Sequence, residues 1–364
     1  MAWIGVADTT QGRFRATGLG DHGPDPETSS LAPDTLVARG SILLETRLAP
    51  EGRPQTLLAF SHNHPWTGSF SMRALPGGAI VLAENCGDDL RHAVLQHDVD
   101  ARSEMVRITY SWDAPNRWAR LTLEHLASDR IFSKDLPPPH PMLLADLRMI
   151  ARYPTQRAMD RDVSYFALAD HIHPIGPMPG LTSHAPVATP HGYMAAGHLK
   201  RGDTVITDDG EVAPVLQTVK LTVPAYGHFR PVRLRAPFFG LRQDILIAPQ
   251  QRLVMGGSQV EYMFGTEAVL IPARHLVNRV SAFHADGPDL VTYHHLLLPE
   301  HKALIVAECP IESLYIGRLR RKPVALAASL LARFERARLP EHARPVWPVL
   351  KPIEAITLAQ VRAA

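Results

Sequence analysis

The stretch LKRGDTVITDDG, residues 199–210, decides the fold of the C-terminal half of the chain. Residues 201–203 form a turn signal that leads into the β-branched run 204–206, and residues 208–210 form a hairpin signal that returns the chain. β-Branched side chains pack well on a pleated sheet, and glycine accepts the backbone angles of a tight turn. The stretch therefore predicts short antiparallel strands in this half of the chain.

Six further fragments of the same half follow strand and turn patterns. They are ATPHG (188–192), PVRLRA (231–236), DILIAPQQRLVM (244–255), EAVLIPARHLVN (267–278), TYHHLLLPEHKALIVAE (292–308) and IESLYIG (311–317). In order and spacing, and together with residues 199–210, they resemble the Hint domains of bacterial proteins, which are related to hedgehog proteins and inteins. The resemblance implies an all-β, horseshoe-shaped Hint fold for residues 180–318.

The resemblance also implies where the chemistry of this family would lie. In Hint autoprocessing, a cysteine, serine or threonine at the first position attacks the preceding carbonyl, and a later histidine protonates the departing amide nitrogen. Here the first position falls on Gly180 and the histidine position on Gln251. Glycine has no nucleophile, and an amide exchanges no proton near pH 7. We therefore expect a catalytically degenerate domain, and no splicing, because no His-Asn terminus follows Gly317.

A displaced nucleophile is the alternative. Thr182 or Ser183 would then attack in place of residue 180, with His184 or His301 as the base. Two or three residues along a strand correspond to roughly 7 to 10 Å, and catalysis tolerates far less misplacement. The first three residues are more simply interpreted as strand and turn positions, and His301 as a buried histidine bonded to backbone.

The segment from residue 292 to 309 adds two predictions about packing. His294 and His295 are adjacent, so on a strand one is expected to face inward and the other to face solvent. Cys309 follows a strand and is interpreted as a small core residue rather than a reactive thiolate.

The first 136 residues alternate β-like runs with turn signals, which predicts an antiparallel β-sandwich. The expected strands are SILLETRLAP (41–50), QTLLAFS (55–61), SFSMRAL (69–75), AIVLAEN (79–85), AVLQHDV (93–99), MVRITYSW (105–112) and ARLTLEHL (119–126). Residues 76–78, Pro-Gly-Gly, suit a tight hairpin.

The segment RITYSWDAPNRWARLTLE (107–124) resembles the strand-turn-strand of concanavalin-like and laminin-G-like sandwiches. That resemblance implies binding of sugar or protein by a lectin-like domain. Trp66, Trp112 and Trp118 would offer stacking surfaces to such a ligand. The competing interpretation is that these tryptophans belong to the core or the rim, as most strand tryptophans do.

Residues 137–179 are interpreted as a proline-rich linker with a short helix, LLADLRMIARY (143–153). His171 and His173 in this segment, like His62 and His64 earlier, have the spacing that points two imidazoles one way along a strand. Neither pair has a nearby cysteine or an obvious third ligand, so no metal site is expected.

Residues 319–364 are expected to form a C-terminal helix and tail. The apolar positions of residues 323–339 recur at three- and four-residue intervals, which predicts a basic amphipathic helix. Such a helix can bind a membrane or a partner groove, but more often packs its apolar stripe on its own domain.

Composition limits the remaining functions. With 38 basic and 36 acidic side chains, the net charge of +2 gives no electrostatic footprint for nucleic acid. Cys86 and Cys309 are the only cysteines, which excludes a disulfide framework. We expect no cofactor, no transmembrane segment and no N-terminal secretory signal, hence a cytoplasmic protein or one exported by a signal-independent route.

Two functional hypotheses follow. The first is a non-enzymatic binding or scaffolding protein, in which a lectin-like sandwich with an unknown protein or carbohydrate ligand is joined to a degenerate Hint domain. The second is a self-cleaving protein with a displaced nucleophile. A sugar hydrolase in the sandwich would need two carboxylates roughly 5 to 10 Å apart in a cleft, and the sequence alone shows no such pair.

Overall fold

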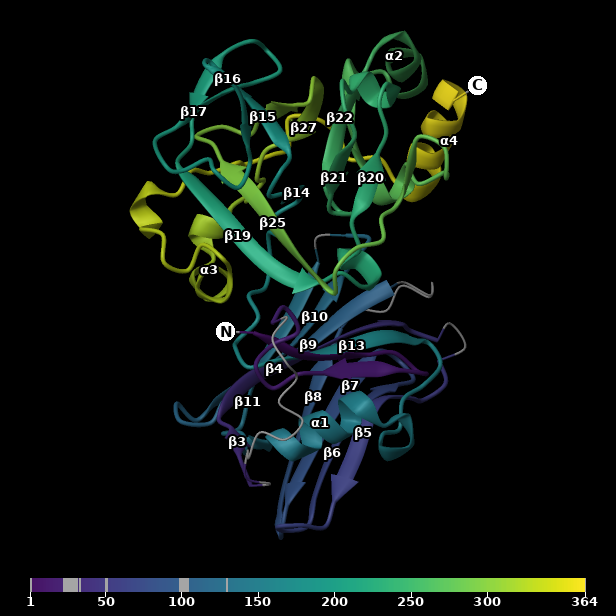
Figure 1. Ribbon diagram of the computed structural model, residues 1–364, viewed down its shortest axis with the longest axis vertical. Helices are drawn as coiled ribbons and strands as arrows, with labels where there is room; N and C mark the ends of the chain where they lie inside the picture. The colour runs from purple at the N-terminus through teal and green to yellow at the C-terminus, as the bar shows by residue number, and fades with distance from the viewer. Residues whose placement is uncertain are drawn as a thin grey trace. The chain divides into compact units, whose positions relative to one another are not determined.

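The computed structural model describes residues 2–21, 32, 34–49, 52–97, 105–128 and 130–363. The chain divides into two compact units, residues 1–173 and 174–364. Antiparallel strands dominate both units, with a few short helices among them (Figure 1). The all-β class predicted from the sequence is confirmed. No helix in the described ranges combines the length and apolar character needed to cross a membrane.

A seven-stranded antiparallel sheet forms one layer of the first unit. In spatial order its strands are β11 (Ile131–Leu136), β10 (Trp118–His125), β9 (Met105–Asp113), β4 (Arg39–Arg47), β13 (Val163–Ala169), β1 (Trp3–Ala7) and β2 (Gly12–Phe14). A two-residue pairing of β3 (Leu36–Val37) with β12 (Met142–Leu143) lies outside this sheet. Three of the seven strands, β4, β9 and β10, coincide with runs predicted from the sequence.

A four-stranded meander forms the second layer. Its strands are β5 (Gln55–His62), β6 (Gly68–Leu75), β7 (Ala79–Cys86) and β8 (Asp89–Gln96), paired in chain order. The hairpin between β6 and β7 turns at Gly77 and Gly78, whose φ angles of 85° and 87° favour glycine. All four strands match predicted runs; residues 98–99 of the run 93–99, and residue 50 of the run 41–50, lie outside the described residues.

The two layers pack face to face around a common apolar core. Ile42 and Ile108 from the larger sheet and Met72 and Leu82 from the smaller one belong to one cluster, and none is more than 4% exposed. Ile108 and Met72 alternate along their strands with more polar neighbours, as a strand with one core-facing side requires. The first unit is therefore the antiparallel β-sandwich that the sequence predicted.

The interpretation of residues 137–179 as a linker is wrong for most of the segment. β13 lies in the middle of the seven-stranded sheet, between β4 and β1. The short predicted helix is confirmed as α1 (Leu144–Arg152), and its Leu147 and Ile150 are buried in the sandwich core. The run VSYFALA of β13 is buried almost throughout and so lacks the alternation that marks a half-exposed strand.

Two six-stranded sheets and a small hairpin build the second unit. The first sheet has the order β19 (Gln217–Pro224), β25 (Leu290–Leu297), β14 (Leu181–Thr182), β21 (Ile245–Ile247), β20 (Val232–Leu234) and β24 (Ala282–His284). The second has the order β16 (Gly192–Ala195), β15 (Pro186–Thr189), β26 (Ala303–Val306), β27 (Cys309–Glu312), β22 (Arg252–Gly256) and β23 (Ala268–Pro272). The predicted strand and return around residues 208–210 are confirmed as the pair β17 (Thr204–Ile206) and β18 (Val212–Pro214).

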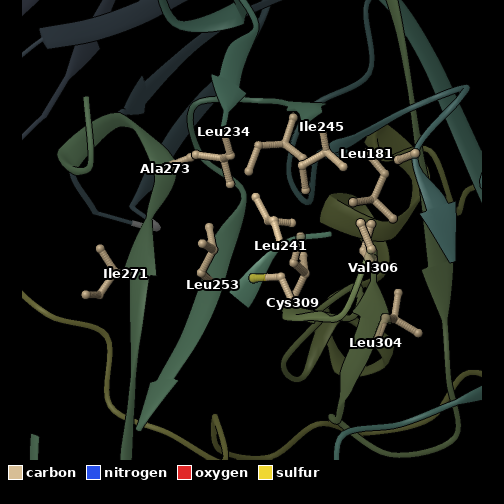
Figure 2. Packing of buried hydrophobic residues seen from close by; sticks show 14 of the residues in the cluster. Leu181, Leu234, Leu241, Ile245, Leu253, Ile271, Ala273, Leu304, Val306 and Cys309 are labelled. Atoms are coloured by element: carbon tan, nitrogen blue, oxygen red, sulfur yellow. The ribbon is translucent and has the colours of Figure 1, made fainter. Parts of the chain in front are cut away.

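One apolar cluster joins the sheets of the second unit. Figure 2 shows Leu181, Leu253, Val306 and Cys309, which come from four different strands, converging on it. The prediction that Cys309 is a core residue is confirmed, because it is 1% exposed. Burial also raises the pKa of its thiol to about 12, which keeps it protonated at neutral pH.

The helix predicted for residues 323–339 is shorter in the structure. α3 (Pro323–Ala328) ends where Ser329 turns extended, and the Ser329 hydroxyl donates to Leu326 O (2.8 Å) and accepts from Leu331 N–H (3.1 Å). Leu326 and Leu331 nonetheless pack on their own unit, as predicted. The longer C-terminal helix is α4 (Pro352–Ala363), and α2 (Ser258–Phe264) lies between β22 and β23.

Candidate functional site

Gly180 is buried and its backbone is fixed from both sides. It directly precedes β14, whose Leu181 pairs with Ile247 of β21 and with His294 of β25. The Ala248 N–H donates to Gly180 O at 2.7 Å. The position that the resemblance assigns to the nucleophile therefore lies in the interior of a sheet rather than on a free end.

Gln251 fills the space in front of Gly180. A Cβ built on Gly180 would stand 2.0 Å from Gln251 Oε1 and 2.8 Å from its Cδ. Gln251 lies between β21 and β22 and is 3% exposed. The two positions that the resemblance assigns to nucleophile and histidine thus face one another, but glycine and glutamine occupy them.

The Gln251 amide acts as a structural donor. Its Nε2 donates to Glu312 O at 3.0 Å and to Arg252 O at 3.3 Å, while Oε1 is buried without a hydrogen-bond partner among the described residues. Glu312 O also contacts His295 Nε2 at 2.9 Å. The glutamine therefore stabilises the β22–β27 region, and its amide carries no proton that acid-base catalysis can use.

Ser183 contacts an imidazole. Its Oγ lies 3.1 Å from His294 Nε2, a residue of β25. Burial and the nearby Lys220 ammonium lower the pKa of His294, which leaves the ring neutral at pH 7. A neutral imidazole can accept the serine proton, so this pair has the composition of a nucleophile and its base.

The other three candidates do not join this pair. The Thr182 hydroxyl donates to Leu246 O at 2.8 Å, which ties it to the neighbouring strand. His184 is exposed to solvent. His301 is buried, with Nε2 3.0 Å from Glu312 Oε1 and Nδ1 accepting the Val346 N–H at 3.1 Å.

His294 and His295 were predicted to lie on opposite faces of a strand, one inward and one in solvent. The prediction that one of them faces solvent is wrong. They are 8% and 4% exposed, so both are buried. The two side chains do lie on opposite faces of β25, since His294 contacts Ser183 and His295 contacts Glu312. Both faces of β25 are covered, and this is why sequence reasoning missed His294 as a partner of Ser183.

In the sandwich, the three tryptophans differ in exposure. Trp112 is fully buried and its Nε1–H donates to Val37 O at 2.9 Å. Trp118 has the Arg120 guanidinium 5.0 Å above its ring. Trp66 is 38% exposed. Trp112 is therefore a core residue, and Trp66 has the most free ring surface of the three.

The two histidine pairs have separate surroundings. His62 Nδ1 lies 2.5 Å from Asp146 Oδ2, whereas His64 is exposed. His171 and His173 both lie edge-on to the Trp3 ring, at 5.6 and 5.4 Å between centroids. Within the part of the chain that the structure describes, no group of three or more His, Cys, Asp or Glu side chains is arranged to hold a metal ion.

Comparison with protein-family models finds one match, to the family described as Hint domain, over residues 179–318. Residues 179–318 form a Hint domain. The match begins one residue before Gly180 and ends one residue after Gly317, so it contains the Gly180–Gln251 contact and the Ser183–His294 pair. None of the curated protein sequences compared with the chain matches it.

Solved structures similar to parts of the chain have low sequence identity. The MchDnaB-1 intein is 15% identical, with a TM-score of 0.24 over 36% of this chain and 98% of that one. A carbohydrate-binding module of a Ruminococcus gnavus sialidase, bound to α2,3-sialyllactose, is 12% identical, with a TM-score of 0.27 over 38% of this chain and 77% of that one. Tailspike protein 2 of an Escherichia coli O157:H7 bacteriophage is 7% identical, with a TM-score of 0.22 over 37% of this chain and 17% of that one.

Proposed function

We propose that the chain is a binding protein in which a Hint domain without processing chemistry at residue 180 is joined to a ligand-binding β-sandwich. One observation carries the first half of this proposal: the fit of Gly180 against Gln251. Any attacking atom at residue 180 needs a Cβ, and a Cβ there would stand 2.0 Å from Gln251 Oε1. Residue 180 thus supplies no nucleophile, and Gln251 occupies the space that one would need there.

Intact-mass spectrometry of the purified full chain tests this proposal. After long incubation at neutral pH, with and without a thiol or hydroxylamine, the chain is expected to keep its mass of 40.1 kDa. A cut before residue 180 would leave 179 and 185 residues, about 19.7 and 20.4 kDa at the mean residue mass of this chain. Appearance of those two masses would contradict the proposal.

A second candidate function is slow self-cleavage before Ser183. A displaced serine still lies next to its own preceding carbonyl, so a shift along the chain misplaces only the base. His294 Nε2, 3.1 Å from Ser183 Oγ, takes that place. The Thr182 carbonyl oxygen accepts the Ala185 N–H at 3.0 Å, which puts a donor on the atom where negative charge develops.

The reaction would be an acyl shift followed by hydrolysis. Ser183 Oγ bonds to the Thr182 carbonyl carbon, the Thr182–Ser183 C–N bond breaks, and the Oγ proton passes through His294 to the leaving amine. Water then hydrolyses the ester to a Thr182 carboxylate. The products are two fragments of 182 residues each, because the chain has 364.

Mass spectrometry also locates the cut, which a gel does not, because equal-length fragments form a single band. Under the second candidate, S183A and H294Q abolish the cut. T182V is the matched control, because the Thr182 hydroxyl contacts only a neighbouring backbone carbonyl. A wild-type chain that stays intact contradicts this candidate.

For the sandwich we propose a carbohydrate or protein ligand that stacks on Trp66, the ring with the greatest exposure of the three tryptophans singled out from sequence. Titration of the full chain with oligosaccharides, including sialyllactose and lactose, is the first test. W66A is expected to weaken binding at least tenfold, and W118A to leave it unchanged. Equal losses in both variants would contradict the placement at Trp66.

A further inference from the structure

The positive charge of the chain is concentrated in one segment of the second unit. Residues 318–344 contain eight Arg or Lys side chains and two Glu side chains, a net charge of +6 at pH 7. The rest of the chain contains 30 basic and 34 acidic side chains, a net charge of −4. All eight basic side chains of the segment are exposed. We call these eight side chains the basic surface.

Buried leucines hold the segment, which includes α3 (Figure 1), against its own unit. Leu319 is buried between the exposed Arg318 and Arg320, and Leu339 is buried next to the exposed Arg338. Both leucines belong to one apolar cluster, which also contains side chains of β19 and β25. The apolar side chains are therefore used for folding, and the charged neighbours of each leucine are left to face solvent.

Side-chain contacts bring basic residues from both ends of the segment together. Arg336 Nε donates to Arg320 O at 2.8 Å, and Arg321 Nη2 donates to Glu341 Oε2 at 2.7 Å. That second hydrogen bond, together with the charges of Arg320 and Arg318, lowers the pKa of Glu341. The basic surface is therefore one continuous feature here rather than a series of separate charges.

Both acidic side chains of the segment are paired within it. Glu341 is bonded to Arg321, and Glu335 lies 2.8 Å from Arg338. The other six basic side chains have no carboxylate partner among the described residues: Arg318, Arg320, Lys322, Arg333, Arg336 and Arg344. Their charge is available to a partner outside the chain, and that partner must be negatively charged.

Nucleic acid is one class of polyanion, but the segment lacks the elements that read it. A duplex groove is read by a helix or a two-stranded ribbon that enters it, whereas α3 has only six residues. Single strands are bound by stacking bases on aromatic rings. Phe334, the one Phe, Tyr or Trp of the segment, is partly buried and packs on the apolar cluster.

Val324 favours a membrane instead. Its side chain is 65% exposed and follows Lys322 by two residues. An apolar side chain beside cations fits the boundary between lipid headgroups and acyl chains, and clusters of about four to eight Lys or Arg are typical of binding to anionic lipids. We propose that the basic surface docks the chain on an anionic phospholipid membrane, chiefly through charge.

Co-sedimentation of the full chain with lipid vesicles tests this proposal. Vesicles of phosphatidylcholine are compared with vesicles in which one third of the lipid is phosphatidylglycerol. We expect binding at least tenfold tighter to the anionic vesicles in about 0.1 M salt, and its loss in about 1 M salt, because the Debye length falls from about 10 Å to about 3 Å. Equal binding to both kinds of vesicle, or binding that survives the high salt, overturns the proposal.

An oligonucleotide competitor separates the two classes of polyanion. Double-stranded and single-stranded DNA are added at the same phosphate concentration as the anionic vesicles. We expect most of the chain to stay with the vesicles. Tighter binding to either DNA overturns the membrane as partner and assigns the basic surface to nucleic acid.

A triple variant locates the contact. R318Q/R320Q/K322Q removes three exposed charges that form no ion pair, so folding is expected to be unaffected. Each basic residue near an anionic surface strengthens binding roughly fivefold, so the variant is expected to bind the anionic vesicles about a hundredfold more weakly. The comparison of wild-type binding to the two kinds of vesicle needs no variant and stands by itself should this one fail to fold.

The matched control removes the same charge elsewhere on the second unit. R235Q/R242Q/R279Q changes three exposed residues that lie outside the segment. This variant is expected to bind within about fivefold of the wild type, because distant charges are screened. Equal losses in the two triple variants would mean that net charge alone drives the binding, and would overturn the assignment to the basic surface.

Discussion

Gly180→Ala is the smallest change that tests the central contact of the Hint domain. The added methyl group is the Cβ that would stand 2.0 Å from Gln251 Oε1, 2.8 Å from Cδ and 2.9 Å from Cβ of the same side chain. Contacts below 3 Å force the neighbour to move. Gln251 can move only by giving up the bond from its Nε2 to Glu312 O, which is buried.

The magnitude follows from these two costs. Overpacking a close-packed site costs about 1 to 3 kcal/mol, and a hydrogen bond lost with its donor left buried costs about 1 to 3 kcal/mol. Replacing glycine by alanine restricts the unfolded chain and returns about 0.4 to 1 kcal/mol. We therefore expect G180A to destabilise the Hint domain by about 1 to 6 kcal/mol.

The assay is a double-mutant cycle with Q251A, measured by urea unfolding of the full chain and by hydrogen exchange of residues 245–256. Q251A removes the Oε1 and Cδ contacts but keeps the Cβ contact, and Glu312 O keeps its bond to His295. The double variant is therefore expected to recover about 1 to 2 kcal/mol relative to additivity. A G180A cost below about 0.5 kcal/mol, or additive effects in the cycle, would refute the reasoning.

Two further predictions concern the stability of the same domain. Burial, together with the charges of Arg274 and His228, lowers the pKa of His275 to about 4. An unfolded histidine titrates near 6.5, so as the pH falls below that value the unfolded chain binds the proton first, and stability is lost between about pH 6.5 and pH 4. Because His275 is partly exposed and solvent screens its charge, the loss is expected to stay below the roughly 3 kcal/mol that the full shift would give. H275N should flatten this part of a plot of urea midpoint against pH, and an unchanged slope would contradict it. Leu253→Ala removes a fully buried side chain from the cluster of Figure 2 and should cost about 2 to 5 kcal/mol by urea unfolding; a cost below about 1 kcal/mol would mean that the site collapses freely.

Whether a strand of the sandwich could be predicted from the sequence depends on how clearly its residues alternate between apolar and polar. Runs such as SFSMRAL and MVRITYSW alternate apolar and polar residues, and strands occupy all seven predicted runs of the sandwich within the described residues. β13 was missed because VSYFALA is buried on both faces and carries no alternation. The helix predicted over 323–339 stopped early, because the Ser329 hydroxyl bonds to backbone groups that would otherwise continue it.

The candidate site shows a different limit. Spacing along the chain assigns Gly180 and Gln251 to the family's two positions, and in the structure these two residues lie against each other. Spacing gives no register between strands far apart in sequence, however. β14 and β25 are more than 100 residues apart, and only their pairing brings Ser183 to His294.

The Gly180–Gln251 contact also bears on the proposal that this domain lacks processing chemistry at residue 180. Had only the nucleophile been replaced, the space in front of residue 180 would remain, and a single substitution to cysteine would refill it. Here the glutamine side chain occupies that space and is bonded to Glu312 O, a carbonyl that also contacts His295. The two residues are therefore fitted to each other, and a nucleophile restored at 180 needs a second change at 251 before it has room. We expect G180C alone to lose stability without gaining cleavage, a result that separates a repacked site from one that has merely lost its attacking atom.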